Sequence, residues 1–243
     1  MNFELSPKSV YGSLIQYGVA LVPPIYNQHC INEWNEKLDC FFKYEVSVNR
    51  NYVRADQLHT LGILESILNK DLQDLISSLM NDAVLYHCHV YEIEGEQKSS
   101  HIHADNGLNG WHRDEDCLYA VEKNQLHHFS MFVYLSDVAD ENGPFQIAPI
   151  SAFDNLKRNT PSLKITGQRG TCFFFDRTFF HRATPNQSIT RRRVLKLSFQ
   201  NKDLFNDRIV LPEFTKVKES LIETNSDISH WFGSRLDEVS HVA

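Results

Sequence analysis

A series of short apolar segments, separated by turn-forming residues, runs from Val84 to Gln200 and restricts the folds open to this chain. Aromatic and β-branched side chains dominate the segments, and Gly, Pro, Asn and Asp gather between them. Many short strands joined by turns are typical of all-β sandwiches and barrels. We therefore predict a mainly β fold with flanking helices, arranged as a jelly roll. The expected strands cover residues 86–93, 129–135, 145–149, 171–176 and 193–200.

The first third of the chain has a different, helical pattern. Apolar residues fall at helical spacing from Ile31 to Phe42, and leucines recur at helical spacing from Leu61 to Leu79. The short apolar run Val19-Ala20-Leu21-Val22, which prolines follow, is expected to form an edge strand. We expect one domain over residues 1–243. It has a helical part over about 1–83, a core over about 84–205 and a C-terminal extension to which no function is assigned.

Charge and cysteine content exclude several functional classes. The 24 basic and 31 acidic residues give a net charge of -7, and the dense basic cluster Arg191-Arg192-Arg193 is too short for a nucleic-acid surface. Five scattered cysteines without a CxxC pair argue against a zinc site and a disulfide scaffold. The start of the chain does not resemble a signal peptide, and no apolar run approaches the ~20 residues of a membrane span. We expect a soluble cytoplasmic protein without nucleic-acid or membrane partners.

The tripeptide His112-Arg113-Asp114 is the strongest indication of chemistry. Side chains at i and i+2 of a strand point to the same face, so this imidazole and carboxylate could share one metal ion. His181, which follows the apolar segment 172–175, could supply a third ligand. Two histidines and one carboxylate form the facial triad of non-haem Fe(II) oxygenases. With 12 histidines in the chain, a His-x-Asp match also arises by chance on loops, but the neighbouring strand segments favour the metal site.

An arginine eleven residues after His181 suggests a co-substrate site. An oxygenase that uses 2-oxoglutarate must hold the far carboxylate of that molecule, and a guanidinium does so as a bidentate, permanently charged partner. Strand alternation places Arg192 on one face and its two arginine neighbours on the other. We interpret Arg192 as the functional residue and expect Arg191 and Arg193 to face solvent.

Two sets of strand residues are candidates for the pocket wall. Ser130, Phe132 and Tyr134 share one strand face, and His89 and Tyr91 share another. Ordinary packing of a buried strand explains each of them equally well. The remaining histidines near the motif are expected to be solvated loop residues, and Trp111 and Cys117 to be packing residues. These histidines are His101, His103, His127 and His128.

Residues about 84 to 200 resemble the phytanoyl-CoA dioxygenase family of Fe(II)/2-oxoglutarate oxygenases. The resemblance rests on three stretches and extends to the opening Gly18-Val19-Ala20-Leu21-Val22. One departure is the stretch 148–153, where such proteins usually read Pro-Gly-Ser-His. That segment supplies no metal ligand, so the departure concerns loop geometry. The three stretches are Trp111-His112-Arg113-Asp114, Leu135 to Pro144, and His181 through Asn186 and Ser188 to Arg192.

The resemblance implies a double-stranded β-helix with Fe(II) on His112, Asp114 and His181. It further implies that 2-oxoglutarate chelates the iron and pairs with Arg192, that O2 takes the remaining coordination position, and that an unactivated C–H bond is hydroxylated with release of succinate and carbon dioxide. Relatives that chlorinate carry a small residue at the position of Asp114. The carboxylate here therefore favours hydroxylation over halogenation, while desaturation, epimerisation and ring formation stay open.

A small molecule, such as an amino acid or a biosynthetic metabolite, is the preferred substrate because the chain is compact. An acyl group on coenzyme A or a carrier protein is the alternative. A second enzyme class remains, a cupin-like isomerase or hydrolase that needs the metal and ignores 2-oxoglutarate. A non-catalytic jelly-roll binding protein is the least favoured reading, because all three ligand residues are present.

Overall fold

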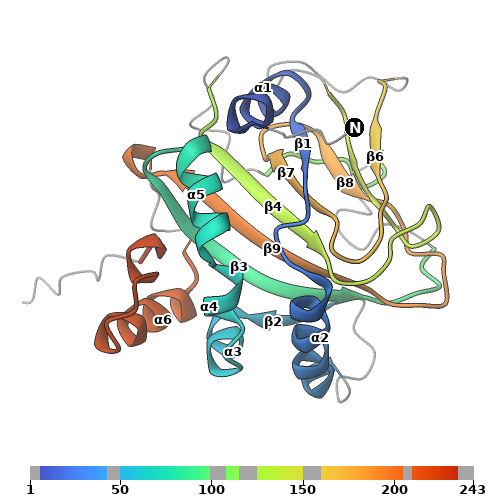
Figure 1. The fold of residues 1–243 in the computed structure, drawn as a ribbon. Helices are drawn as coiled ribbons and strands as arrows, with labels where there is room; N and C mark the ends of the chain where they lie inside the picture. The colour runs from blue at the N-terminus through green and yellow to red at the C-terminus, as the bar shows by residue number, and fades with distance from the viewer. Residues whose placement is uncertain are drawn as a thin grey trace, which may run out of the picture.

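Two antiparallel sheets form the body of the protein (Figure 1). The computed structural model describes residues 6–42, 50–98, 108–114, 125–149, 160–204 and 210–234. The larger sheet has six strands in the order β1 (Val19–Val22), β7 (Cys172–Asp176), β4 (His128–Tyr134), β9 (Arg192–Asn201), β3 (Ala83–Ile93) and β2 (Arg50–Arg54). The smaller sheet has three, in the order β6 (Leu163–Ile165), β5 (Phe145–Ile147) and β8 (His181–Ala183). This confirms the prediction of a mainly β jelly roll.

Side-chain alternation along the larger sheet creates two separate cores. On β9, Leu195, Leu197 and Phe199 pack into a core that also contains the buried helix residues, whereas Val194 packs into a second core with Phe145 and other residues of the smaller sheet. Successive side chains of a strand point to opposite faces, so one strand serves both cores. The larger sheet therefore has an outer face under helices and an inner face toward the smaller sheet. The inner face carries the site described below.

The outer face is covered by α2 (Gln28–Phe42) and by three short helices, α3 (Ala55–Thr60), α4 (Leu64–Ile67) and α5 (Lys70–Leu79) (Figure 1). The prediction of a helix over Ile31 to Phe42 is confirmed. The leucine-rich stretch is helical but interrupted. Gly62 has a left-handed φ of 63°, and Asn69 caps α5 by accepting a hydrogen bond from the backbone of Leu72. Such residues end and restart helices, so periodicity alone could not reveal the breaks.

The N-terminal part is not purely helical as predicted. α1 (Pro7–Tyr17) leads into β1, which is an edge strand of the larger sheet as expected. The segment before α3, in which no period was recognised, contains β2 at the opposite edge. β2 has the polar sequence Arg-Asn-Tyr-Val-Arg, which does not indicate a strand. It is a strand because it pairs with β3. α6 (Pro212–Glu223) and the short 3-10 helices Lys202–Leu204 and Ser229–Trp231 complete the described elements.

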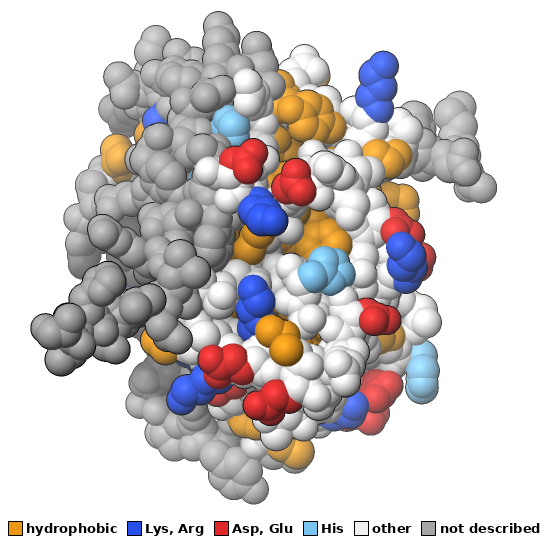
Figure 2. All heavy atoms as spheres, turned by 90° about the vertical axis from the view of Figure 1, so that its left-hand side faces the viewer, with side chains coloured by type: hydrophobic (Ala, Val, Ile, Leu, Met, Phe, Trp, Pro, Cys, Tyr) orange, Lys and Arg blue, Asp and Glu red, His pale blue; other side chains and the backbone are white. Residues whose placement is uncertain are grey.

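Charged side chains of both signs are mixed on one face of the protein (Figure 2). On the face shown in Figure 2, the described acidic and basic side chains are interspersed and do not separate into a large patch of one sign. None of the helices in the described ranges combines the length and the apolar character that crossing a membrane requires.

Candidate metal centre

His112, Asp114 and His181 meet in space. One ligand atom from each of them lies within 4.8 Å of the others, and the two imidazole rings are 4.5 Å apart. His181 Nε2 lies 3.7 Å from Asp114 Oδ2. These separations are small enough for a single ion to contact all three side chains, and the donor set of two imidazoles and one carboxylate is the one that non-haem Fe(II) uses.

A single antiparallel bridge joins the backbone of His112 to that of His181. The amide of His112 donates to the carbonyl of His181 at 3.0 Å, and the amide of His181 donates back at 2.9 Å. Asp114 N donates to the carbonyl of Arg177 at 3.3 Å. The prediction that His112 and Asp114 lie on a regular strand is wrong, because an isolated bridge to the start of β8 positions them. The extended backbone still lets both side chains reach one site.

Backbone carbonyls fix the orientation of both imidazoles. His112 Nδ1 lies 2.8 Å from the carbonyl oxygen of Gly110, and His181 Nδ1 lies 2.9 Å from that of Phe179. An Nδ1–H that donates to a carbonyl leaves Nε2 as the free lone pair, which is the form that binds a metal. Burial also lowers the pKa of His181 to about 3, so this ring is neutral at neutral pH.

The carboxylate is held by a buried arginine that the sequence did not single out. Arg177 Nε donates to Asp114 Oδ2 at 2.6 Å, and the arginine side chain is only 6% exposed. Burial alone would raise the pKa of Asp114, but nearby positive charge, first of all that of Lys196, outweighs it and holds the pKa below its usual range. Asp114 is therefore an anion with one oxygen oriented by Arg177.

Arg192 is buried at the start of β9, on the inner face of the sheet. Its side chain is 1% exposed. Among the described residues, no acceptor lies within hydrogen-bonding distance of its buried Nε and Nη1 atoms. An unsatisfied buried guanidinium costs free energy, so it indicates a site that an anionic ligand completes.

The turn before β9 is tightly fixed, which sets the position of Arg192. Asn186 is fully buried and donates to the carbonyl of Thr190 at 2.7 Å. Gly143 packs against this turn with φ 73°, and a Cβ there would lie 2.6 Å from the carbonyl oxygen of Thr184. Only glycine fits that approach. The Asn-Gly-Pro turn and the segment after His181 therefore support each other.

The expectation that Arg193 faces solvent is wrong. Arg193 is buried rather than solvated, and it pairs with Glu92 on β3 and with Asp39 on α2. Arg191 is 41% exposed and lies 3.3 Å from Glu92, so it is partly solvated as expected. The outer face at this point is covered by α2, which strand alternation could not predict.

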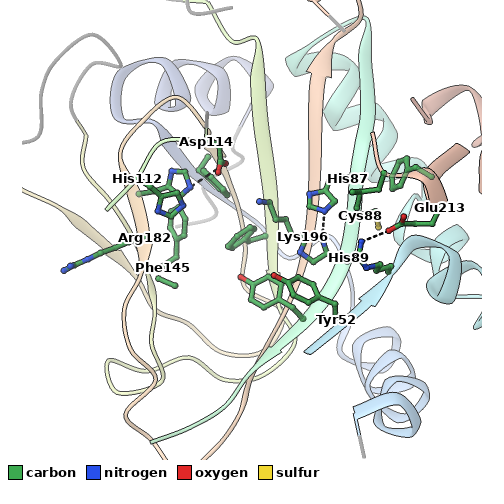
Figure 3. Close-up of a pocket in the computed structure, with 18 residues that line it drawn as sticks. Tyr52, His87, Cys88, His89, His112, Asp114, Phe145, Arg182, Lys196 and Glu213 are labelled. Carbon is green, nitrogen blue, oxygen red and sulfur yellow. Dashed lines mark hydrogen bonds and ion pairs between the residues drawn. The ribbon is translucent and has the colours of Figure 1, made fainter. Parts of the chain in front are cut away.

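A cavity of about 370 Å³ opens beside the triad (Figure 3). Of the candidate pocket residues, His89, Tyr91 and Phe132 line it. Ser130 and Tyr134 are not among its lining residues: Ser130 is buried against Ser198, with the hydroxyl oxygens 2.8 Å apart, and Tyr134 donates to the carbonyl of Ile165 at 2.7 Å. The packing explanation therefore holds for Ser130.

A β-bulge turns two histidines toward the cavity. The register of β3 against β9 shifts between Leu85 and His87. Leu85 and Cys88, three residues apart, both pack in the outer core, although Cys88 also borders the cavity. His87 and His89 line the cavity, with His89 Nδ1 3.0 Å from His87 Nε2. Bulges re-aim side chains in this way next to functional sites.

Several cavity residues lie in segments for which the sequence suggested no role. Lys196 on β9 and Tyr52 and Arg54 on β2 line the cavity, and so do Glu213 and Phe214 of α6. Arg54 Nη1 lies 2.8 Å from Glu213 Oε1, so β2 and α6 are joined at the cavity wall. The C-terminal segment, to which the sequence assigned no function, therefore contributes to the cavity wall. The alternation of β9 places Lys196 on the same face as Arg192, which was a usable signal.

The other histidines and Trp111 are mostly structural or outside the described residues. His128 is fully buried on β4 near Gln200, with a pKa that burial lowers to about 4, so the prediction of a solvated loop residue was wrong. Trp111 packs under Arg182, whose guanidinium lies 4.7 Å from the ring centre. His101, His103, Cys117 and the residues of the divergent stretch from position 150 onward lie outside the described residues.

Several solved structures have the same fold as this chain. The epimerase SnoN from nogalamycin biosynthesis superposes with a TM-score of 0.62 at 16% identity, over 80% of this chain and 83% of that one. The carbocyclase SnoK from the same biosynthesis gives 0.62 at 16% identity, over 82% and 85%. HygX from Streptomyces hygroscopicus, solved with nickel and 2-oxoglutarate, gives 0.62 at 11% identity, over 80% and 87%. At these identities the likeness concerns the fold.

Sequence comparison assigns the family. No curated protein matches the chain significantly. The family model described as Phytanoyl-CoA dioxygenase (PhyH) matches residues 35–194, which contain β2 to β8, the triad and Arg192. Because this match covers more than half of the chain, the protein belongs to the phytanoyl-CoA dioxygenase (PhyH) family.

Proposed function

We propose that this protein is an Fe(II)- and 2-oxoglutarate-dependent dioxygenase that hydroxylates an unactivated C–H bond of a small molecule. The observation that carries the proposal is the combination of a His-Asp-His triad with a buried guanidinium whose Nε and Nη1 have no acceptor among the described residues. Family membership and the three solved structures, all with the same fold, support the reaction class.

The residues present fit Fe(II) in preference to a structural zinc ion. Three protein ligands leave coordination positions open, whereas structural zinc sites are closed by four. Bound Fe(II), together with 2-oxoglutarate and O2, would supply the oxidising power that no amino-acid side chain has. Arg177 would keep Asp114 in one orientation while the imidazoles keep Nε2 toward the metal.

Arg192 and the aromatic wall have distinct roles in this proposal. Arg192 would bind the far carboxylate of 2-oxoglutarate, because a planar guanidinium matches a carboxylate with two parallel hydrogen bonds. Phe132, Phe145 and Phe175 line the cavity beside the triad, and their rings lie 4.6 to 5.4 Å apart. These rings would exclude water from the reacting bond and hold the substrate in place.

The size of the cavity favours a small substrate over an acyl-CoA. Its volume of about 370 Å³ lies at the low end of the ~300–1,000 Å³ of small-molecule sites. A coenzyme A thioester would leave most of its length outside the described cavity. Hydroxylation is the outcome we propose first, because Asp114 fills the position that halide would need. SnoN and SnoK, an epimerase and a carbocyclase, show that one fold supports other outcomes.

The proposal is tested by reconstitution. The purified protein should bind one Fe(II) and, without oxygen, 2-oxoglutarate. With oxygen and ascorbate it should form succinate, faster in the presence of substrate. His112→Ala should abolish metal binding and succinate formation, whereas His230→Ala, an exposed histidine at the far 3-10 helix, should change neither. Full metal binding by the His112→Ala protein would refute the assignment.

The rival class is a metalloenzyme that does not use 2-oxoglutarate. The buried, unsatisfied nitrogens of Arg192 argue against it, since nothing in that mechanism would occupy them. A metal-loaded protein that fails to bind 2-oxoglutarate in a calorimetric titration would favour the rival.

A further inference from the structure

The segment that carries two of the three candidate metal ligands, residues 108–114, lies outside the named strands of both sheets. It contacts β8 and the turn before it. The backbone of His112 bridges that of His181, and the amide of Asp114 donates to the carbonyl of Arg177. The position of these two ligands relative to His181 therefore depends on how firmly the segment is fixed to β8 and its turn.

Arg182, the residue after His181, makes three contacts that fix the start of this segment. Its Nη1 donates to the backbone carbonyl of Asn109 at 2.8 Å, and its guanidinium lies 4.7 Å from the centre of the Trp111 ring. Its Nε donates to Gln146 Oε1 at 2.8 Å, and Gln146 is the direct partner of Arg182 in the pairing of β5 with β8. The planar guanidinium, with its fixed fork of donors, thus joins the segment to two strands of the smaller sheet.

The turn that Arg182 contacts also orients a metal ligand. Asn109 and Gly110 both have a left-handed backbone, with φ of 57° and 81°. An asparagine in that region is less stable than in the common regions, so it persists where the surrounding structure fixes it. The carbonyl oxygen of Gly110 lies 2.8 Å from His112 Nδ1 and orients that ring. A change in this turn would therefore move the imidazole of His112.

Arg182 is placed to hold the protein chain rather than a ligand in the cavity. Figure 3 shows its side chain extending away from the side of the cavity that carries Lys196. Arg177 fixes the other end of the segment, since its Nε donates to Asp114 Oδ2 at 2.6 Å. One arginine before His181 and one after it therefore contact the two ends of the ligand-bearing segment.

We propose that Arg182 is a positioning residue for the metal centre: it fixes the turn at Asn109 and Gly110 and thereby places His112 so that the three ligands can bind one ion. This inference rests on the proposed function, which requires that ion. The charge of Arg182 gives no benefit of its own, because a positive group repels a nearby divalent cation. Charge and position therefore predict opposite effects. Loss of the guanidinium tightens metal binding if only its charge acts and weakens metal binding if its position acts.

The test measures the affinity of the full chain for cobalt(II) alone, whose visible absorption also reports the ligand geometry. Arg182→Met should bind cobalt(II) about 10- to 100-fold more weakly than wild type, and its absorption spectrum at saturation should differ. Arg182→Lys keeps the charge but loses the fork of donors, so its loss should lie near the lower end of that range. Arg169→Met, which replaces an exposed arginine in the turn before β7, is the control and should bind as wild type does.

Two results would overturn the inference. The first is a cobalt(II) affinity of Arg182→Met that equals or exceeds that of wild type. The second is a loss of stability in urea with an unchanged affinity and spectrum of the folded protein, which would make Arg182 purely structural.

Two further measurements keep the test decisive. If Arg182→Met does not fold, Arg182→Lys and Gln146→Leu, which removes the acceptor of Nε, take its place: weaker cobalt(II) binding in both supports the inference, and unchanged binding in both overturns it. Failure of the wild type itself to bind cobalt(II) would refute the proposed function together with this inference. That result is distinct from equal affinities in wild type and variants, which would overturn the inference alone.

Discussion

Two adjacent arginines on β9 show how differently the two faces of the larger sheet use the same residue. Arg193, on the outer face, donates from Nε and Nη2 to Glu92 Oε1, from Nη1 to Asn35 Oδ1 and from Nη2 to Asp39 Oδ1. Arg192, on the inner face, has two buried nitrogens without an acceptor among the described residues. Burial is therefore common to the two arginines, and what differs between them is the satisfaction of their hydrogen bonds.

The difference follows from what covers each face. α2 packs on the outer face and supplies Asn35 and Asp39 to Arg193, with the guanidinium also 4.8 Å from the Phe42 ring. The inner face meets the smaller sheet, whose described core residues at this point are apolar. A permanently charged group among apolar residues costs free energy until a ligand arrives. Arg193 therefore belongs to a satisfied network on the outer face, whereas the role proposed for Arg192 on the inner face is to bind an anion.

The largest expected effect is on the outer face. Arg193→Met should lower the free energy of unfolding by about 3–5 kcal/mol, because it removes the buried partner of Glu92 and leaves that carboxylate only the partly exposed Arg191. Urea unfolding measures this loss, and the folded fraction should bind 2-oxoglutarate as wild type does. A loss below about 1 kcal/mol would show that the network around Arg193 is not structural, and the comparison would fail.

Replacing Arg192 on the inner face by methionine should not lower stability as the Arg193 substitution does. Arg192→Met removes a buried charge, so the ligand-free protein should be at least as stable as wild type. Its affinity for 2-oxoglutarate should fall about 100-fold, since hydrogen bonds to charged groups are lost. Calorimetry of the nickel-loaded protein gives the affinity, and metal binding is the internal control. An unchanged 2-oxoglutarate affinity would contradict the role of Arg192.

The comparison also shows what sequence could and could not predict. Strand alternation correctly placed Arg192 and Arg193 on opposite faces of β9, and the expectation that His112, Asp114 and His181 lie close together is confirmed. The choice of Arg192 as the 2-oxoglutarate residue from its distance to His181 stays a prediction. The burial of Arg193 was missed because it depends on where α2 packs, which is a tertiary contact. Arg177 was missed because a lone cation in a turn usually faces solvent, whereas the alternation of β9 could have placed Lys196 on the face of Arg192.

The bulge in β3 and the participation of α6 had no local signal. A bulge adds one residue to a strand without a distinctive composition at Leu85 to His87. α6 reaches the cavity through Glu213, whose partner Arg54 is 159 positions away in the sequence. Long-range pairs of this kind come from the fold as a whole.

Two buried carboxylates, Glu92 and Asp176, differ in the same way as the two arginines. Glu92 has Arg193 as its partner, whereas the recorded hydrogen bonds to Asp176, at the end of β7, come from the amide and hydroxyl of Thr178. Burial outweighs these hydrogen bonds and raises the pKa of Asp176 to about 6. Asp176 therefore adds most to the free energy of unfolding when it is protonated, below its ordinary pKa near 4. This contribution is lost as the pH rises through about 6.

Asp176→Asn should accordingly be stabilising at pH 8 and much less so at pH 5. The amide oxygen keeps the acceptor for Thr178 and removes the buried charge, so the gain at pH 8 should approach, as an upper bound, about 3 kcal/mol. Urea unfolding of both proteins at the two pH values measures the difference. A gain that does not depend on pH would show that the carboxylate is not the cause.

The smallest expected effect sharpens the outer-face network itself. Asp39 accepts from Arg193 at 2.8 Å but is 54% exposed, whereas Glu92 is 7% exposed. Water screens an exposed pair, so Asp39→Asn should cost less than about 1 kcal/mol, and the loss should shrink further in 0.5 M salt. If Asp39→Asn destabilised the protein as much as Arg193→Met, the strength of the network would lie in the contact with α2. A small, salt-sensitive loss would instead show that the buried Glu92–Arg193 pair gives the network its strength. Arg192, on the inner face, would have a comparable anionic partner only when a ligand binds.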